Sequence, residues 1–182
     1  YNIGLKYKDY RDDKSESEFE GQVRLWVLTI LQMAPAAIIT PGRQNITLWH
    51  RLCGGEIGAW VKNNAHGGAS IAHFAKWEPI LFVGKHLRVR DSDVFEHHVD
   101  NGFLNDDAAV GHLCPKPVRL WDDLLRHYSK EGCRISEPFC GSGTTIIAAE
   151  NLSRQCRAVE ISPGYVAVAL QRYLDAFGIR GE

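Results

Sequence analysis

The residues best suited to chemistry lie in a glycine-rich loop between a predicted strand and a predicted helix. This loop reads Cys140-Gly-Ser-Gly-Thr-Thr145. Glycines at such a turn let a ligand approach the backbone closely, and the start of the helix offers free N–H groups. Glu160 ends the next predicted strand. Dinucleotide-binding folds place a carboxylate there, about 20 residues after the loop, to accept hydrogen bonds from ribose. The combination predicts a nucleoside site.

Two common phosphate-binding motifs do not match this loop. A Walker A motif ends in Gly-Lys-Ser or Gly-Lys-Thr, whereas Gly143 is followed by Thr144 and Thr145. The third glycine position of the dinucleotide fingerprint is occupied by Ile146. The alternative to a nucleoside site is a helix start that merely contains glycines, with a surface glutamate beyond it.

Hydrophobic periodicity predicts the elements that must position this loop. Apolar residues at helical spacing predict four helices, which begin near Ser15 or Ser17, at 117, at the glycine loop and at 163. Both Ser15 with Glu18 and Ser17 with Glu20 have the spacing of a capping box, and Gly178 would end the last helix. Short apolar runs predict strands over 36–40, 56–62, 77–83, 134–139 and 157–161. Strands that alternate with helices are typical of an α/β fold with a mainly parallel sheet. Most of this sheet precedes the glycine loop, whereas dinucleotide folds usually open with it.

Composition narrows the class of protein. The 182 residues are 45% hydrophobic and 24% charged, which is typical of one globular domain and excludes extended disorder. The formal net charge of −1 excludes a uniformly basic coat and allows a local basic patch. Apolar runs are far shorter than the ~20 residues that span a bilayer, so we expect no membrane partner. Five cysteines without a Cys-x-x-Cys pair predict neither disulfides nor a metal site, and favour the cytoplasm.

Three segments resemble the DNA amino-methyltransferase family, in the subgroup whose catalytic motif precedes the cofactor motif. The segment Glu137-Pro-Phe-Cys-Gly-Ser-Gly-Thr-Thr145 resembles the family's Asp-Pro-Phe-x-Gly-Ser-Gly-Thr-Thr loop, with Glu137 in place of Asp. The segment His112-Leu-Cys-Pro-Lys-Pro117 is similar to His-Pro-Thr-Gln-Lys-Pro. The opening Tyr1-Asn-Ile-Gly4 resembles the residues directly after Asp-Pro-Pro in the catalytic motif. The stretch from Trp77 to Lys85 also looks like a late strand of the family.

The resemblance implies a Rossmann-like, S-adenosyl-methionine-dependent methyltransferase fold that is circularly permuted. It implies one methyltransferase domain over 1–182, with a short inserted loop over 85–111 as a candidate target-recognition region. If Tyr1 is the motif tyrosine, the catalytic Asp-Pro-Pro lies upstream of the sequence. We therefore expect a chain that is truncated at its N-terminus and is inactive on its own.

The resemblance also implies a set of residues that bind S-adenosyl-methionine. Glu160 would hold the ribose, Ile161 would pack on the adenine, and Lys116 would meet the carboxylate of the methionine part. The full set is His112, Cys114, Lys116, Glu137, Phe139, Cys140, Gly141, Ser142, Gly143, Thr144, Glu160 and Ile161.

The implied partner is double-stranded DNA with a flipped target base, because an amino group inside the base stack cannot reach a methyl donor. Tyr1 would be the catalytic-site residue that stacks on this base. Lys85, His86, Arg88 and Arg90 surround the apolar Leu87 and Val89, so a strand would place several of these cations on one side. From there they could contact phosphates, with Lys85, Arg88 and Arg90 as the candidate DNA-binding residues. The alternative is an ordinary solvated strand. A recognition segment this short favours help in binding DNA, either from a second subunit in a homodimer or from another domain.

The resulting hypothesis is a site-specific DNA adenine methyltransferase of a bacterial or phage restriction-modification type, since Tyr1-Asn-Ile-Gly4 looks more like adenine enzymes. One alternative is methylation of the amino group of cytosine. Another is a non-catalytic methyltransferase-like module that binds cofactor or DNA. A nicotinamide-dependent oxidoreductase is a third, and it would leave the His112–Pro117 segment without a role.

Overall fold

The computed structural model describes residues 13–64, 75–85, 92–99 and 116–178. The chain divides into two compact units, residues 1–98 and 99–182, and each is described by itself. The single methyltransferase domain inferred from the sequence stays a prediction. No helix in the described segments is long and apolar enough to cross a membrane.

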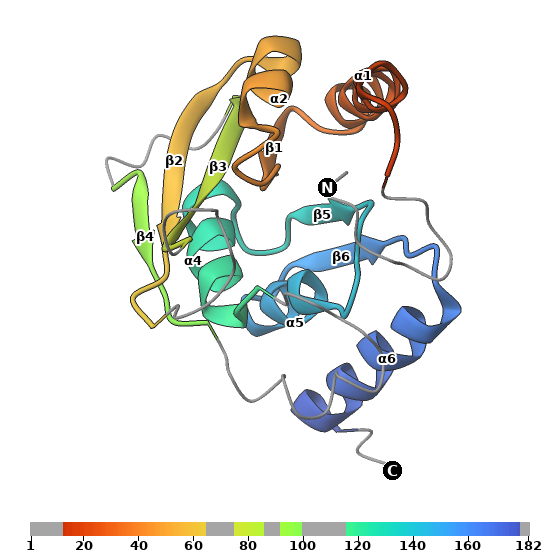
Figure 1. Cartoon of the computed structure of the whole chain (residues 1–182). Coiled ribbons are helices and arrows are strands. Elements are labelled where there is room, and N and C mark those ends of the chain that lie inside the picture. Colours follow the sequence, from red (N-terminus) through yellow and green to blue (C-terminus); the bar gives the residue numbers. More distant parts are fainter. Residues whose placement is uncertain (1–12, 65–74, 86–91, 100–115, 179–182) are drawn as a thin grey trace. The chain divides into compact units, whose positions relative to one another are not determined.

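The first unit contains a four-stranded sheet in the order β1-β3-β2-β4 (Figure 1). Its strands are β1 (Ala36–Ile39), β2 (Glu56–Val61), β3 (Trp77–Gly84) and β4 (Val94–Glu96). β3 runs antiparallel to both β1 and β2, whereas β4 runs parallel to β2. Residues 79–83 of β3 are buried, so β3 is the central strand of this unit in both position and packing.

The prediction of a mainly parallel sheet is wrong in this unit. Helix α2 (Ile46–Cys53) connects β1 to β2, which run in the same direction as expected of a strand–helix–strand crossover. β3 lies between them and pairs with both in the opposite direction. An apolar run predicts a strand but carries no information about the direction of its neighbours. Neither α2 nor β4 was expected, and β4 falls within the predicted insertion over 85–111.

Helix α1 (Glu16–Met33) begins at the predicted capping box. The Ser15 hydroxyl accepts a hydrogen bond from the Glu18 N–H, and a Glu18 carboxylate oxygen accepts one from the Ser15 N–H at 2.9 Å. These two bonds satisfy donors that a helix start leaves open. The capping box therefore fixes where the helix starts, and the spacing of Phe19, Val23 and Val27 determines which face is buried.

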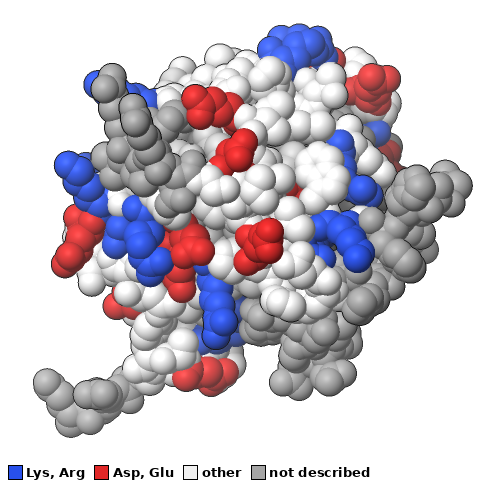
Figure 2. Space-filling model, turned by 90° about the vertical axis from the view of Figure 1, so that its left-hand side faces the viewer, with Lys and Arg blue, Asp and Glu red and all other residues white. Residues whose placement is uncertain are grey.

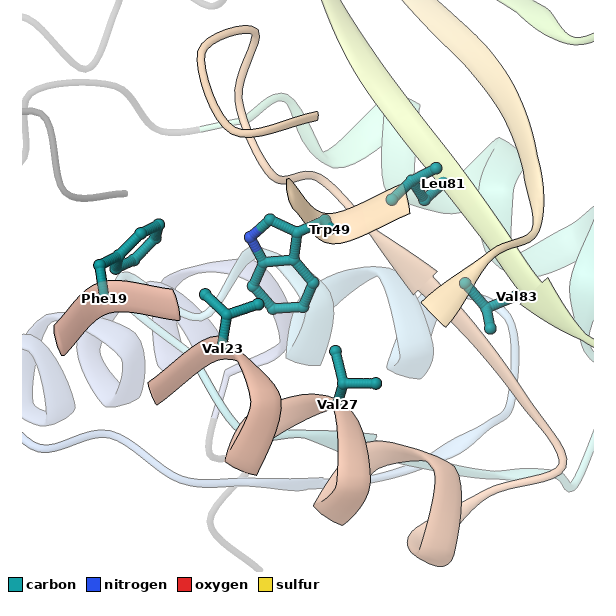
Figure 3. Packing of buried hydrophobic residues seen from close by; sticks show 6 residues of the cluster. All are labelled: Phe19, Val23, Val27, Trp49, Leu81 and Val83. Carbon is teal, nitrogen blue, oxygen red and sulfur yellow. The ribbon is translucent and has the colours of Figure 1, made fainter. Parts of the chain in front are cut away.

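The core of the first unit lies between α1, α2 and β3. Its buried side chains come from all three elements, as Figure 3 shows: Phe19, Val23, Val27, Trp49, Leu81 and Val83. Trp26 of α1 stacks on Trp49 of α2 with the ring centroids 6.2 Å apart. Burial of apolar area of this kind is the main force that holds a helix against a sheet.

The second unit is built on a parallel strand–helix–strand motif. Strands β5 (Arg134–Glu137) and β6 (Gln155–Ala158) pair in parallel, and α5 (Thr144–Asn151) connects them. Helices α4 (Val118–Tyr128) and α6 (Pro163–Phe177) complete the unit. Leu125, Ala148 and Ala149 form its buried cluster. β6 begins two residues before the predicted strand over 157–161 and already ends at Ala158, so Glu160 follows the strand rather than lying in it.

One buried ion pair joins β3 to the residue that follows β2. The Lys62 ammonium lies 2.5 Å from a Glu78 carboxylate oxygen, and their side chains are 9% and 17% exposed. The same ammonium lies 4.9 Å from the centroid of the Trp60 ring. The Glu78 carboxylate and the Trp60 ring offset the cost of removing this ammonium from water.

Replacing Glu78 with Gln should lower the free energy of unfolding by about 3 kcal/mol, because it leaves the Lys62 ammonium buried without a counter-charge. Glu56→Gln is the matched control, since Glu56 is exposed in the adjacent strand β2 and should change stability by less than about 0.5 kcal/mol. Chemical denaturation measures both. Equal stability of the two variants would show that the ion pair contributes nothing.

Candidate functional site

The glycine-rich loop connects β5 to α5 through a tight turn. Gly141 and Gly143 both have positive φ, at 53° and 81°, which favours glycine at these positions. The Gly143 N–H donates to the Cys140 carbonyl at 3.0 Å and closes the turn. The Cys140 N–H donates to the Val159 carbonyl at 3.0 Å, so hydrogen bonding between the two chain segments continues beyond the ends of β5 and β6.

This continued pairing brings the Glu160 side chain against the loop. One carboxylate oxygen accepts the Gly141 N–H at 2.7 Å, and the other accepts the Ser162 N–H at 2.9 Å. An ionised carboxylate has about four lone-pair sites, so each oxygen keeps capacity for a further donor. Glu160 is half-buried, and a ligand that carries two neighbouring hydroxyls fits this capacity. The predicted proximity of the glycine loop and Glu160 is therefore present.

Glu137 supports the loop from within. One of its carboxylate oxygens accepts the Phe139 N–H at 2.9 Å, and the other accepts the Thr145 hydroxyl at 2.8 Å. The first bond fixes the start of the loop and the second fixes the first turn of α5. Glu137 thus orients the backbone that surrounds the nucleoside position. Its predicted direct contact with a cofactor stays a prediction.

Two large apolar side chains beside the loop are turned to solvent. Phe139 is 53% exposed and Ile161 is 67% exposed. Each follows one of the paired strands, so both lie at the carboxyl ends of β5 and β6. Ligands of open parallel sheets bind at this edge. An acidic side chain between exposed apolar groups matches a molecule with a polar sugar and a flat apolar base.

The other side of the loop is buried against α6. Ser142 and Thr144 are only 2% and 7% exposed. A Cβ atom added to Gly143 would lie 2.8 Å from the Cβ of Ala169, so only glycine allows α6 to approach this closely. These three predicted cofactor-binding residues therefore shape the loop from its inner side in the described contacts.

Arg172 of α6 is a residue of this site that was not expected from the sequence. Its Nη1 donates to the Ser142 carbonyl and to the Ser142 hydroxyl, each at 2.7 Å. The sequence contains a weak signal for it, because Arg172 is the one basic residue in a mostly apolar helix. A charge in such a helix needs a partner, but the sequence does not say which one.

Cys140 lies in the loop without the properties of a nucleophile. The pKa of its thiol is raised to about 11. The largest cause is burial, and the nearby negative charges of Glu137 and Glu160 add to it. The thiol is therefore protonated at neutral pH, and a protonated thiol is a poor nucleophile. In the described part of the chain, no group of three or more His, Cys, Asp or Glu side chains is placed to hold a metal ion.

Several predicted residues lie outside the described residues, and their roles stay predictions. These residues are Tyr1, Arg88, Arg90, His112 and Cys114. Lys116 is half-buried just before α4, in the same unit as the glycine loop. Lys85 is exposed directly after β3 in the first unit. On the face shown in Figure 2, Lys and Arg side chains are interspersed with Asp and Glu.

The family model described as DNA methylase matches residues 1–171. The chain belongs to the DNA methylase family. Among relatives, the type II methyltransferase M.HindIII of Haemophilus influenzae is 30% identical over 132 residues, which are 72% of this chain and 37% of that protein. The chain thus spans little more than a third of this DNA methylase's length.

Solved structures of DNA methylases have the same fold as this chain. The complex of M1.HpyAVI with SAM has a TM-score of 0.70 at 19% identity, over 88% of this chain and 85% of that chain. The cytosine-N4-specific PvuII DNA methyltransferase has a TM-score of 0.66 at 16% identity, over 95% and 78% of the two chains. The predicted Rossmann-like methyltransferase fold is confirmed. Its circular permutation and truncation stay predictions.

Gly143→Ala should destabilise this DNA methylase more than Gly132→Ala does. Both glycines have positive φ, 81° and 74°, so each substitution costs about 1–2 kcal/mol in backbone strain. Only at Gly143 does the added Cβ also collide with Ala169, whereas nothing lies within 4 Å of such an atom at Gly132. Overpacking should add about 1–3 kcal/mol. Thermal or chemical unfolding of the two variants measures the difference, and equal losses would contradict the close approach of α6.

Proposed function

We propose that this chain carries the S-adenosyl-methionine site of a DNA methyltransferase that modifies the exocyclic amino group of adenine. The observation that carries the proposal is the Glu160 carboxylate, held 2.7 Å from the Gly141 N–H at the carboxyl end of a parallel strand pair. The family match and the fold likeness to M1.HpyAVI, which was solved with SAM, support the same reading.

The residues around the loop fit the adenosine part of this cofactor. Glu160 has free acceptor capacity for the two ribose hydroxyls, while its bonds to Gly141 and Ser162 keep it in place. Ile161 would pack on the adenine, and Phe139 would cover the cofactor from the neighbouring strand end. Glu137, Cys140, Ser142, Gly143 and Thr144 would set the shape of the loop beneath it.

The methionine part would extend toward the segment that precedes α4. Lys116 would pair with its carboxylate, because an ammonium and a carboxylate form a strong charge-assisted hydrogen bond. His112 and Cys114 would complete this end of the site, as the resemblance of the His112–Pro117 segment implies. Lys116 and the glycine loop belong to the same unit of the chain, which is consistent with one continuous site.

The bound cofactor would supply a methyl group on a positively charged sulfur, and the amino nitrogen of the base would take it up as it loses a proton. An amino group inside the duplex is out of reach, so the target base would be flipped out of the helix. Tyr1 would stack on the flipped base. The chain's own residues would act by binding and orienting the two reactants, which removes much of the entropic barrier.

Contacts with the DNA backbone would come from the cluster Lys85, Arg88 and Arg90. Lysine and arginine side chains give sequence-independent affinity for phosphates. Lys85 is exposed, as this role requires. The segment over 85–111 is short for a recognition region, so a second copy of the chain would enlarge the DNA-binding surface.

Adenine is favoured over cytosine by one observation, the resemblance of Tyr1-Asn-Ile-Gly4 to adenine enzymes. The fold likeness to PvuII methyltransferase does not reverse this preference, because identity of 16% carries the fold alone. A non-catalytic module of the same fold would bind cofactor without transferring a methyl group. A nicotinamide-dependent enzyme would instead bind NAD at Glu160.

Glu160→Gln should weaken binding of S-adenosyl-methionine about tenfold or more, because the amide supplies fewer acceptors and turns an NH2 group toward a backbone N–H or a ribose hydroxyl. Isothermal titration of the full 182-residue chain measures this affinity. Glu131→Gln is the control, since Glu131 is an exposed glutamate of the same unit. A folded chain that binds NAD but no S-adenosyl-methionine would overturn the proposal.

Expression of a gene that also encodes the expected upstream Asp-Pro-Pro should introduce N6-methyladenine into bacterial DNA, which nucleoside digestion and mass spectrometry detect. The matched control is expression of the Glu160→Gln variant, which should lower the modified fraction because less cofactor is bound. N4-methylcytosine would contradict the adenine assignment and leave the methyltransferase proposal in place. Unmodified DNA, together with cofactor binding by the chain, would favour the non-catalytic module.

A further inference from the structure

Helix α6 packs against the glycine loop and hydrogen-bonds to it, on the side opposite to the proposed ligand. Arg172 donates from Nη1 to three acceptors, the Ser142 carbonyl and hydroxyl at 2.7 Å and the Thr144 hydroxyl at 3.3 Å. Ala169 lies one turn earlier on the same face of α6 and is in contact with the Gly143 position. Two residues of one helix face therefore hold three consecutive residues of the loop.

The bond to the Ser142 carbonyl determines how the centre of the loop is oriented. A peptide unit is planar, and its C=O and N–H groups point in opposite directions. With the Ser142 carbonyl turned toward Arg172, the N–H of Gly143 points away from α6, to the Cys140 carbonyl at 3.0 Å. That bond closes the turn in which the Gly141 N–H meets Glu160.

We propose that Arg172 is a positioning residue, which locks the Ser142–Gly143 peptide so that the loop presents Gly141 and Glu160 in the geometry that binds the cofactor. This inference rests on the proposed function for its consequence for cofactor binding, whereas the hydrogen bonds that lock the loop are independent of that function. Ser142 is 2% exposed, so water cannot readily replace the guanidinium as its partner.

Arginine suits this position better than lysine. Its planar guanidinium is always charged and presents donors in a fixed arrangement, whereas the lysine ammonium is a compact charge on a flexible stem. Arg172→Lys keeps the charge and part of the hydrogen bonding. Arg172→Gln removes the charge and shortens the side chain. The two substitutions should therefore form a graded series, with Lys between the natural residue and Gln.

Arg154 provides a matched control in the same unit. It also bridges two elements, since its Nη2 donates to the Ser129 carbonyl at 2.8 Å and its Nε donates to the Ser129 hydroxyl at 3.2 Å. It bonds to the residue that ends α4 and makes no described contact with residues 140–144. Arg154→Gln should therefore cost stability without disturbing the glycine loop.

The experiment uses the full chain and two readouts at a temperature at which circular dichroism shows every variant folded. Amide hydrogen exchange reports protection of the Gly141 and Gly143 N–H groups without cofactor, and calorimetry reports affinity for S-adenosyl-methionine. Arg172→Gln should speed exchange at both glycines and weaken affinity about tenfold, because hydrogen bonds to a charged group are each worth roughly that factor. Arg172→Lys should lie between, and Arg154→Gln should match the unaltered chain in both readouts.

Each outcome decides between the proposals. Unchanged exchange and affinity in Arg172→Gln would overturn the positioning role, as would equal effects of Arg154→Gln, which would indicate a general loss of stability. If Arg172→Gln does not fold, the Arg172→Lys variant is judged by the same two readouts. If Arg172→Gln speeds exchange at the two glycines but the unaltered chain binds no S-adenosyl-methionine, the role of Arg172 in locking the loop would stand and the proposed function would be rejected.

Discussion

The hydrogen bond between the Glu160 carboxylate and the Gly141 N–H is the contact on which the candidate site depends. Its 2.7 Å length is typical of a bond to an ionised acceptor, and its partners are 19 residues apart in the chain. It exists only because β5 and β6 are parallel and adjacent, so their carboxyl ends meet at one edge. Desolvation of a half-buried carboxylate is costly, and the two backbone donors offset that cost.

The inner side of the glycine loop is buried against the protein, whereas its outer side is flanked by exposed apolar side chains. On the inner side, Ser142, Gly143 and Thr144 are buried against α6, where the absence of a side chain at Gly143 permits contact with Ala169. On the outer side, Phe139 and Ile161 are left exposed. A loop that is packed on its inner side and apolar and open on its outer side is expected of a preorganised ligand site. Affinity improves in such a site because binding does not have to pay the entropic cost of ordering the loop.

Sequence reasoning succeeded where the determining interactions are local. The capping box at Ser15, the glycine turn and the helix end at Gly178 are each set by residues a few positions apart. It failed where the direction of a strand, or the hydrogen-bond partner of a side chain, depends on segments that are distant in the chain. The antiparallel course of β3 follows from its place between β1 and β2, and the partner of Arg172 lies 30 residues earlier in the chain. Helix α2 has only eight residues, which is about two turns, so few positions are available to reveal its period.

Four strands have one edge without a strand partner among the described segments, namely β1, β4, β5 and β6, and two of them bear on the site. β1 pairs there only with β3, and β5 pairs only with β6. Both strands contain half-buried apolar residues, and a strand edge of this kind leaves N–H and C=O groups that must bond to water, to another segment or to another chain. Each edge can therefore accept one further strand. A strand added beside β5 would lie next to the glycine loop, because the loop directly follows β5 in the chain. Pairing at this edge would therefore fix the strand from which the loop, and with it the Gly141 N–H that meets Glu160, projects.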